Sequence, residues 1–288
     1  MEQLLEILSP HFLLRNAFYA GLIVGFVCPQ VGIFFVLRRM ILMGIALPQV
    51  SNAGVAFAFL LHTLGWHFFR HIESEKVMAL TGSVFFTLIT IFVLAILERR
   101  RKGFTENRIG FTYAIAGAAA ILFVSWNPYG KSEVLSMLTG EIISIPDIYL
   151  WSMFAIYGTI FIVLIGFHRN FILVSYDIDM ATTIGKKVVL WDIMLYLIIG
   201  IIISFGVMTV GPLVIFGFLL IPPVAARMVT RGIPLFCIVS STVGVVASFA
   251  GFYISYRFDL PTGPTDVALL CVILVLLYLG KMLFRFKR

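Results

Sequence analysis

Three histidines stand close together in the first quarter of the chain, at His62, His67 and His71. His67 and His71 are four residues apart, so a helix would put both imidazoles on one face, at a spacing that binds a divalent transition metal. Such pairs are more often plain surface residues than metal ligands. The three histidines are therefore candidates for a metal site beside that simpler interpretation.

A second polar group lies inside an otherwise apolar run, Met43–Trp66. It consists of Gln49, Ser51 and Asn52, directly after Pro48. Polar groups in a membrane-spanning segment are costly and usually face a cavity or a neighbouring helix. Pro48 has no backbone N–H, which leaves a carbonyl group free to point inward. We expect this patch to line a transport pathway, and the alternative is hydrogen bonding between helices.

Motifs for catalysis and for nucleotide binding are missing from the sequence. Tyr129-Gly-Lys-Ser132 is similar to the end of a phosphate-binding loop, but Ser125 stands where that loop requires its first glycine. There is no HExxH or GxSxG motif, and the apolar runs hold almost no acid, base or nucleophile. We therefore expect no enzymatic activity and no cofactor bound by this chain. An intramembrane enzyme is a remote alternative.

The composition requires lipid as part of the solvent around these residues. Hydrophobic residues make up 61% of the 288 residues and charged residues make up 12%. A soluble domain carries about 25% charged residues. About 20 apolar residues cross a bilayer, so the chain has room for roughly eight to ten helices. We predict an all-α, polytopic transmembrane bundle that forms a single domain over residues 1–288.

Charges, prolines and glycines divide the apolar sequence into nine candidate spans. Two of them are separated only by Gly211-Pro212, which predicts a tight helical hairpin. A shorter apolar piece, Val134–Ile145, is predicted to be re-entrant or to form a short helix at the outer surface. The nine spans are Phe12–Leu37, Met43–Trp66, Val77–Leu97, Ile109–Trp126, Ile148–Phe167, Val189–Thr209, Gly211–Val229, Ile233–Tyr256 and Thr265–Phe284.

Lysine and arginine are distributed unevenly between the two ends of these spans. With the loop after the first span inside, sixteen of the 21 basic residues fall on the inner side. Cytoplasmic loops carry such an excess, so we expect the N-terminus outside and the C-terminus in the cytoplasm of a plasma (inner) membrane. The net charge of +7 then reflects topology, and its partner is membrane lipid rather than nucleic acid.

The longest inner loop, His168–Leu190, contains the pattern of a short amphipathic helix. Asp177 or Asp179 is expected to cap its start, and Gly185 is expected to end it. A capped helix at the membrane surface could press on a motor subunit, although the spacing alone favours a helix that rests on lipid. The apolar face of this helix consists of Ile178, Ala181 and Ile184.

Two adjacent prolines, Pro222 and Pro223, lie inside the run Gly211–Val229. Each removes a backbone donor, so together they are expected to kink the helix. Kinked helices line the pathway in many transporters. A kink with a purely structural role is the open alternative.

Four segments of the chain resemble, in order, the motifs of one protein family. The segments are Val36–Gly44, Asp177–Gly185, Val210–Arg227 and Phe258–Thr265. They are similar to the VLRRMAFLGD, Asp-Pro-Glu-x-Ala-x-x-x-Gly, VGxLLVxALLxxPAAxAR and DLPSGPT motifs of the metal-ion ABC transporter permeases of the zinc and manganese class. Four motifs in the right order are specific where one alone is not, and the resemblance covers the chain from about Ala17 to Phe284.

This resemblance implies the membrane-spanning subunit of an importer for divalent metal ions. Such permeases work by alternating access as a homodimer. They act with separate cytoplasmic ABC ATPase subunits, which use the ATP, and with an extracytoplasmic metal-binding protein. The resemblance also assigns coupling to the ATPase to the inner-loop helix and its ends, namely Asp177, Ile178, Asp179, Ala181, Ile184 and Gly185.

The second span departs from the family motif Gly-Asp-Ala-Leu-Ser-His-Ala. Ile45 stands at the Asp position and Gln49 stands at the His position. Carboxylate and imidazole are natural ligands for a transition metal, whereas an amide oxygen is a weaker ligand and Ile45 offers none. The expected cargo is therefore a zinc- or manganese-class ion or, alternatively, a chelated metal or another small solute. A non-transporting assembly subunit is a further alternative.

Overall fold

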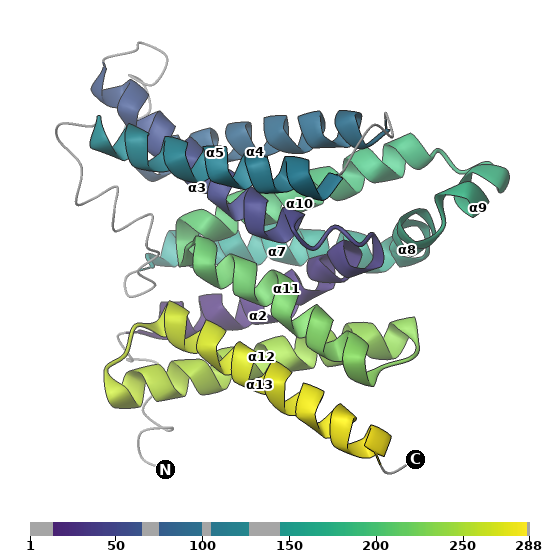
Figure 1. Ribbon diagram of the computed structural model, residues 1–288. Helices are drawn as coiled ribbons and strands as arrows, with labels where there is room; N and C mark the ends of the chain where they lie inside the picture. The colour runs from purple at the N-terminus through teal and green to yellow at the C-terminus, as the bar shows by residue number, and fades with distance from the viewer. Residues whose placement is uncertain (1–13, 65–74, 100–104, 127–144, 287–288) are drawn as a thin grey trace. The chain divides into compact units, whose positions relative to one another are not determined.

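The computed structural model describes residues 14–64, 75–99, 105–126 and 145–286. Every regular element in these ranges is an α-helix. Nine of the helices are long and apolar enough to cross a membrane, which confirms the predicted fold class. The nine, labelled in Figure 1, are α2 Arg15–Leu37, α3 Met43–Thr63, α4 Glu75–Arg99, α5 Thr105–Ser125, α7 Asp147–Gly166, α10 Val188–Val210, α11 Pro212–Val229, α12 Ile233–Phe258 and α13 Thr262–Phe286.

The predicted turn at Gly211-Pro212 is a helix boundary, whereas the prolines inside α3 and α11 do not end these helices. α10 ends at Val210 and α11 begins at Pro212, and Gly211 between them has φ 89°, a value that favours glycine. α3 runs without interruption through Pro48, and α11 does the same through its two prolines. The apolar piece predicted at residues 134–145 lies outside the described residues, apart from Ile145.

Two short helices follow α7. They are α8, His168–Tyr176, and α9, Ile178–Thr183. The sequence pattern predicts the second of them and not the first, because α8 has no capping side chain at its start. The segment His168–Leu190 is therefore largely helical, with only Asp177 between the two helices.

The chain divides into two compact units, each built from separate stretches of sequence. Unit 1 consists of Met1–Val36, Glu141–Ile162 and Leu213–Arg288, and unit 2 consists of Leu37–Gly140 and Val163–Pro212. The single domain predicted for residues 1–288 stays a prediction.

In unit 2, α3 is the central helix. In its most apolar stretch 78% of the residues are buried, compared with 28% for α4 and 17% for α5. α3 contacts α4, α5 and α10. Gly54 of α3 and Gly82 of α4 lie backbone to backbone, because a Cβ on either would collide with the carbonyl group of the other. Small residues of this kind are what close packing of helices in a membrane requires.

In unit 1, α2 packs on α11 and α12, again through glycine. Gly25 of α2 faces Gly244 of α12, and Gly32 of α2 faces the backbone of Leu219 in α11. A Cβ at any of these glycines would overlap a backbone carbonyl group of the facing helix. The absence of side chains at these positions is therefore what lets the helices of unit 1 approach.

Candidate translocation and coupling sites

One face of α3 carries the residues that depart from the family motif. Ile45, Gln49 and Asn52 follow one another at intervals of four and three residues, so they share a face of the helix. Ile45 and Gln49 are half-buried, and Pro48 is buried. The amide of Gln49 lies against α5, where a Cβ added at Gly117 would be 3.4 Å from its Nε2 atom. Gly117 therefore leaves room for this side chain beside α5.

Asn52 supplies the buried amide of this face. The residue is 8% exposed, and its Oδ1 atom has no hydrogen-bond partner among the described residues. Leaving a buried polar atom unpaired costs about 1–3 kcal/mol. In a membrane helix such an atom is a candidate for contact with water or with a transported ion. The other buried unpaired atoms of the described ranges lie on other helices, in Thr87, Ser204, Ser240 and Asp266.

Ser51 lies in a chain of hydrogen bonds between three helices of unit 2. It is fully buried, its Oγ is 2.6 Å from Oγ of Ser83 in α4, and Ser83 Oγ donates to the carbonyl oxygen of Ser204 in α10 at 3.3 Å. The sequence does not predict Ser83 or Ser204, because single serines in apolar helices are too frequent to mark a site. A pathway role for Ser51 stays a prediction beside this structural one.

Only one of the three candidate histidines lies in the described residues. His62 is an exposed residue in the last turn of α3, and His67 and His71 lie outside the described residues. The ranges that the structure describes hold no group of three side chains suited to a metal ion. The histidine site therefore stays a prediction.

Pro222 and Pro223 are both buried in unit 1. Pro223 lies against α2, where a Cβ added at Gly32 would be 2.9 Å from its Cγ atom. The proline ring thus fills the space that Gly32 leaves free. A contribution of the two prolines to the pathway stays a prediction.

The short helix α9 has a well-defined hydrogen-bonded cap at each end. Asp177 has extended φ and ψ angles, and its Oδ1 accepts a hydrogen bond from the Met180 backbone N–H at 2.8 Å. At the other end Gly185 adopts φ 80°, and the backbone N–H of Lys186 donates to the carbonyl oxygen of Ala181 at 3.0 Å. Of the two capping aspartates considered from the sequence, Asp177 is the cap, and Asp179 lies in the first turn.

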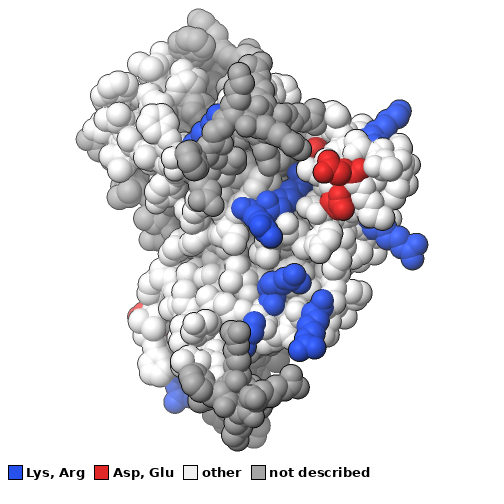
Figure 2. Space-filling model, turned by 45° about the vertical axis from the view of Figure 1, so that its right-hand side comes forward, with Lys and Arg blue, Asp and Glu red and all other residues white. Residues whose placement is uncertain are grey.

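The residues on the apolar face of α9 differ in their exposure. Ala181 is fully buried, whereas Ile178 is 53% exposed and Ile184 is 55% exposed. Asp177 and Asp179 are exposed as well. Figure 2 shows that most of the acidic side chains on the visible surface lie close together, with Lys and Arg side chains nearby. α9 therefore leaves two isoleucines and two carboxylates exposed on its surface.

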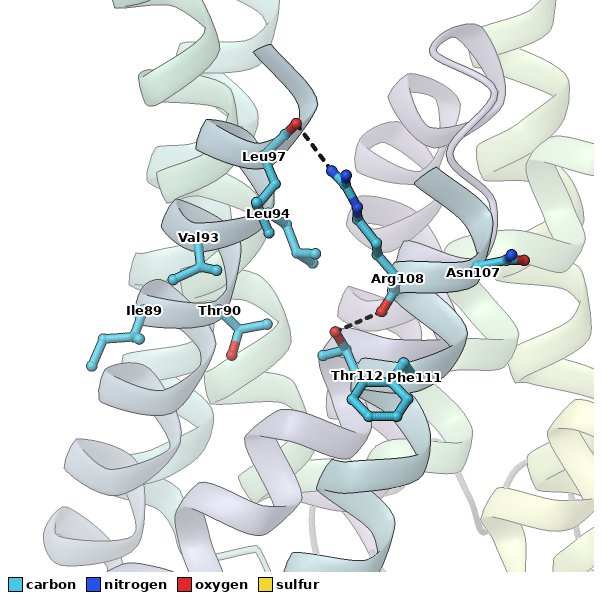
Figure 3. A pocket seen from close by; sticks show the side chains of 9 residues that line it. All are labelled: Ile89, Thr90, Val93, Leu94, Leu97, Asn107, Arg108, Phe111 and Thr112. Atoms are coloured by element: carbon cyan, nitrogen blue, oxygen red, sulfur yellow. Dashed lines mark hydrogen bonds between the residues drawn. The ribbon is translucent and has the colours of Figure 1, made fainter. Parts of the chain in front are cut away.

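A cavity of about 560 Å³ lies between α4 and α5 (Figure 3), and none of its lining residues belongs to α3. Arg108 crosses its rim and donates from Nη1 to the carbonyl oxygen of Leu97 at 3.2 Å. Its walls are mostly apolar, with Phe111 70% exposed. Because it lacks Gln49 and Asn52 and opens on helices that are little buried, we do not assign the pathway to it.

Residues 11–284 match the ABC 3 transport family. This chain belongs to that family. The permease is 24% identical over 267 residues to the "Manganese import system permease protein ScaB" of Streptococcus gordonii, with 93% of this chain and 91% of that protein covered. It is 25% identical over 282 residues to the "Probable iron transport system membrane protein" of Haemophilus influenzae, with 97% and 93% covered.

A solved structure shares the fold of this permease. PsaBC from Streptococcus pneumoniae, in complex with Fab, superposes with a TM-score of 0.80 at 22% identity, covering 96% of this chain and 95% of that one. The family and the nine spanning helices together make the chain a multi-pass metal-transport permease, a transporter subunit and not an enzyme. Membership also implies a partner ATPase that uses ATP and a substrate-binding protein. The resemblance drawn from the four motifs is confirmed.

Proposed function

We propose that this permease imports Mn²⁺, or a divalent ion of similar ligand preference, along the α3 face of Ile45, Gln49 and Asn52. The unpaired Oδ1 of buried Asn52 is the observation that carries the proposal. Carbonyl-type oxygens suit Mn²⁺, whereas imidazole and thiolate suit Zn²⁺. With Gln49 at the position of the family's histidine, the face favours the manganese end of the zinc and manganese class. The name of the Streptococcus gordonii relative agrees with this choice.

The transporter would be a homodimer of this permease with two ATPase subunits and an extracytoplasmic metal-binding protein. The distribution of basic residues supports an N-terminus outside and a C-terminus in the cytoplasm of the plasma membrane. This orientation puts α9 on the cytoplasmic side, where an ATPase can reach it. ATP binding by the partner would then move α9 and drive alternating access.

The coupling role of α9 follows from its exposed residues. Ile178 and Ile184 form an apolar contact for the ATPase, and Ala181 attaches the helix to unit 2. Asp177 and Gly185 hold the two ends of the helix in shape. Asp179 adds a negative charge to the docking surface.

Uptake by the complete importer tests the cargo. The permease is produced with its ATPase and binding protein in cells that lack their own manganese importer, and uptake of Mn²⁺, Zn²⁺ and Fe²⁺ is compared. Asn52→Leu should lower Mn²⁺ uptake while the complex still assembles. Ser51→Ala is the matched control, because its hydrogen bond to Ser83 joins two helices. Ser51→Ala should clearly lower the melting temperature of the complex and should change Mn²⁺ uptake only slightly. Unchanged Mn²⁺ uptake by Asn52→Leu would refute the pathway.

A chelated metal or another small solute is the second candidate cargo. It is favoured by one observation, the absence of an ionised ligand at Ile45 and Gln49. The same cells distinguish the two cargoes when a metal chelator is added to the medium. Uptake that rises with the chelator supports the chelate, and uptake that stops supports the free ion.

Variants of α9 test the coupling. Ile178→Asp should reduce both recovery of the ATPase with the permease and metal-stimulated ATP hydrolysis. Thr183→Asp is the control, because Thr183 is also exposed but lies on the opposite side of the helix from Ile178, Ala181 and Ile184. Equal effects of the two substitutions would mean that the apolar face is not the contact.

A further inference from the structure

A buried ion pair joins three separate segments of unit 2. Arg38 Nη2 is 2.8 Å from Asp192 Oδ1 in α10, and Arg38 Nε donates to Ser175 Oγ in α8 at 3.1 Å. The side chains of Arg38 and Asp192 are only 10% and 14% exposed. The guanidinium also lies over the ring of Tyr196, with its central carbon 5.4 Å from the ring centroid. Arg38 thus has contacts in two helices besides its own segment.

Burial distinguishes the Arg38–Asp192 ion pair from an ordinary ion pair on the protein surface. Exposed pairs contribute little because water and salt screen them. A buried pair whose donors all find acceptors holds its geometry, and removal of one partner leaves an uncompensated charge. The planar guanidinium directs different N–H groups to Asp192 and Ser175, a geometry that lysine cannot reproduce.

Two residues of this cluster are close in sequence to α9 and to α3. Ser175 is two residues before Asp177, the cap of α9. Arg38 is five residues before Met43, where α3 begins with the candidate pathway residues. The chain passes from unit 1 to unit 2 at residues 36 and 37, directly before Arg38. A single side chain in the segment that leads into α3 therefore contacts the end of α8 and the first turns of α10.

The backbone next to Arg38 supports a specific local structure. Arg39 has φ 57°, in the left-handed region that non-glycine residues seldom adopt. Met40, the next residue, is 6% exposed. The turn from α2 to α3 is thus strained and anchored on both sides, by the Arg38 ion pair and by the burial of Met40.

We propose that Arg38 is a positioning residue that makes α8, α10 and the start of α3 move as one block when the ATPase pushes on α9. The proposal rests on the coupling role proposed for α9. It adds that the push reaches the α3 face through the Arg38–Asp192 and Arg38–Ser175 contacts. Without these contacts α9 would still dock on the ATPase, but its movement would no longer reach α3.

The test is the ratio of metal imported to ATP hydrolysed by the complete importer in proteoliposomes. Arg38→Gln should lower Mn²⁺ uptake about tenfold, a coupling effect of ordinary size. ATPase recovery with the permease should stay unchanged, and ATP hydrolysis should fall far less than uptake. Arg38→Lys should also uncouple uptake from ATP hydrolysis, because lysine keeps the charge but lacks the planar guanidinium that bonds to both Asp192 and Ser175. Arg39→Gln is the matched control, since it removes the same charge from the exposed neighbour, and should stay coupled.

Two further variants protect the test against simple misfolding. Ser175→Ala removes one hydrogen bond and leaves the ion pair, so it should be stable and partly uncoupled. The exchange Arg38→Asp with Asp192→Arg should recover part of the coupling that either single change loses. Normal coupling in Arg38→Gln and Ser175→Ala overturns the proposal. Loss of ATPase recovery in both overturns it too, because the cluster would then only support docking. If the unaltered importer neither takes up Mn²⁺ nor shows stimulated ATP hydrolysis, the proposed function fails instead.

Discussion

Gly54→Ala should weaken the packing between α3 and α4. A Cβ at Gly54 would lie 2.9 Å from the carbonyl carbon of Gly82 and 2.9 Å from Cβ of Phe86, closer than real Cβ contacts. Its closest neighbour would be the Gly82 carbonyl oxygen. Because these obstacles include backbone, no side-chain rotation relieves them, and the two helices have to separate.

The magnitude follows from two opposing effects. Overpacking costs about 1–3 kcal/mol, and alanine is about 1 kcal/mol better than glycine inside a helix. Gly110→Ala in α5 is the matched control, because a Cβ there would have nothing within 4 Å. The gain in helix propensity is common to both variants. The free energy of unfolding should therefore differ between them by about 1–3 kcal/mol, the cost of the collision alone.

Thermal melting of the purified permease in detergent measures this difference. Each kcal/mol corresponds to roughly 2–4 °C in a chain of this order of length. Gly54→Ala should melt several degrees below Gly110→Ala. Equal melting temperatures for the two variants would show that the helices do not meet at Gly54.

Three other perturbations probe single contacts. Asp177→Ala removes the acceptor for the Met180 N–H and should destabilise α9 by about 0.5–2 kcal/mol; metal-stimulated ATP hydrolysis should fall, and Asp177→Ser should recover it. Gln30→Leu removes a 2.7 Å hydrogen bond from Nε2 to Ser241 Oγ and should lower the melting temperature by the equivalent of about 0.6 kcal/mol or more; a wild-type melting curve would contradict it. Partial burial lowers the pKa of His168 below its ordinary value of 6.5, so the unfolded chain binds the extra proton more readily than the folded chain. The stability of the permease should therefore fall as the pH drops below 6.5. The melting temperature of His168→Gln should fall less than that of the unaltered permease between neutral and acidic pH.

The sequence is sufficient for the nine spans and for the end of α9 at Gly185, and it limits the start of α9 to Asp177 or Asp179. Apolar runs in lipid satisfy their backbone groups within one helix, so the length and composition of each run predict a span without knowledge of its neighbours. Gly185 is predictable in the same way, because a cap acts within a few residues of itself, whereas the choice of Asp177 over Asp179 required the structure. The family resemblance is carried by local motifs and could be found in the same way.

Side-chain pairings between helices could not be obtained from the sequence. Arg38 and Asp192 are 154 positions apart, and Ser51 and Ser83 belong to different helices. Nothing local distinguishes Arg38 from the adjacent Arg39, although one is held in a buried ion pair and the other is exposed. Which polar group in a membrane helix finds a partner depends on which helix lies beside it. Ser51 is paired, whereas Oδ1 of the adjacent Asn52 has no partner among the described residues, and this contrast becomes visible only once α3 is packed against α4, α5 and α10.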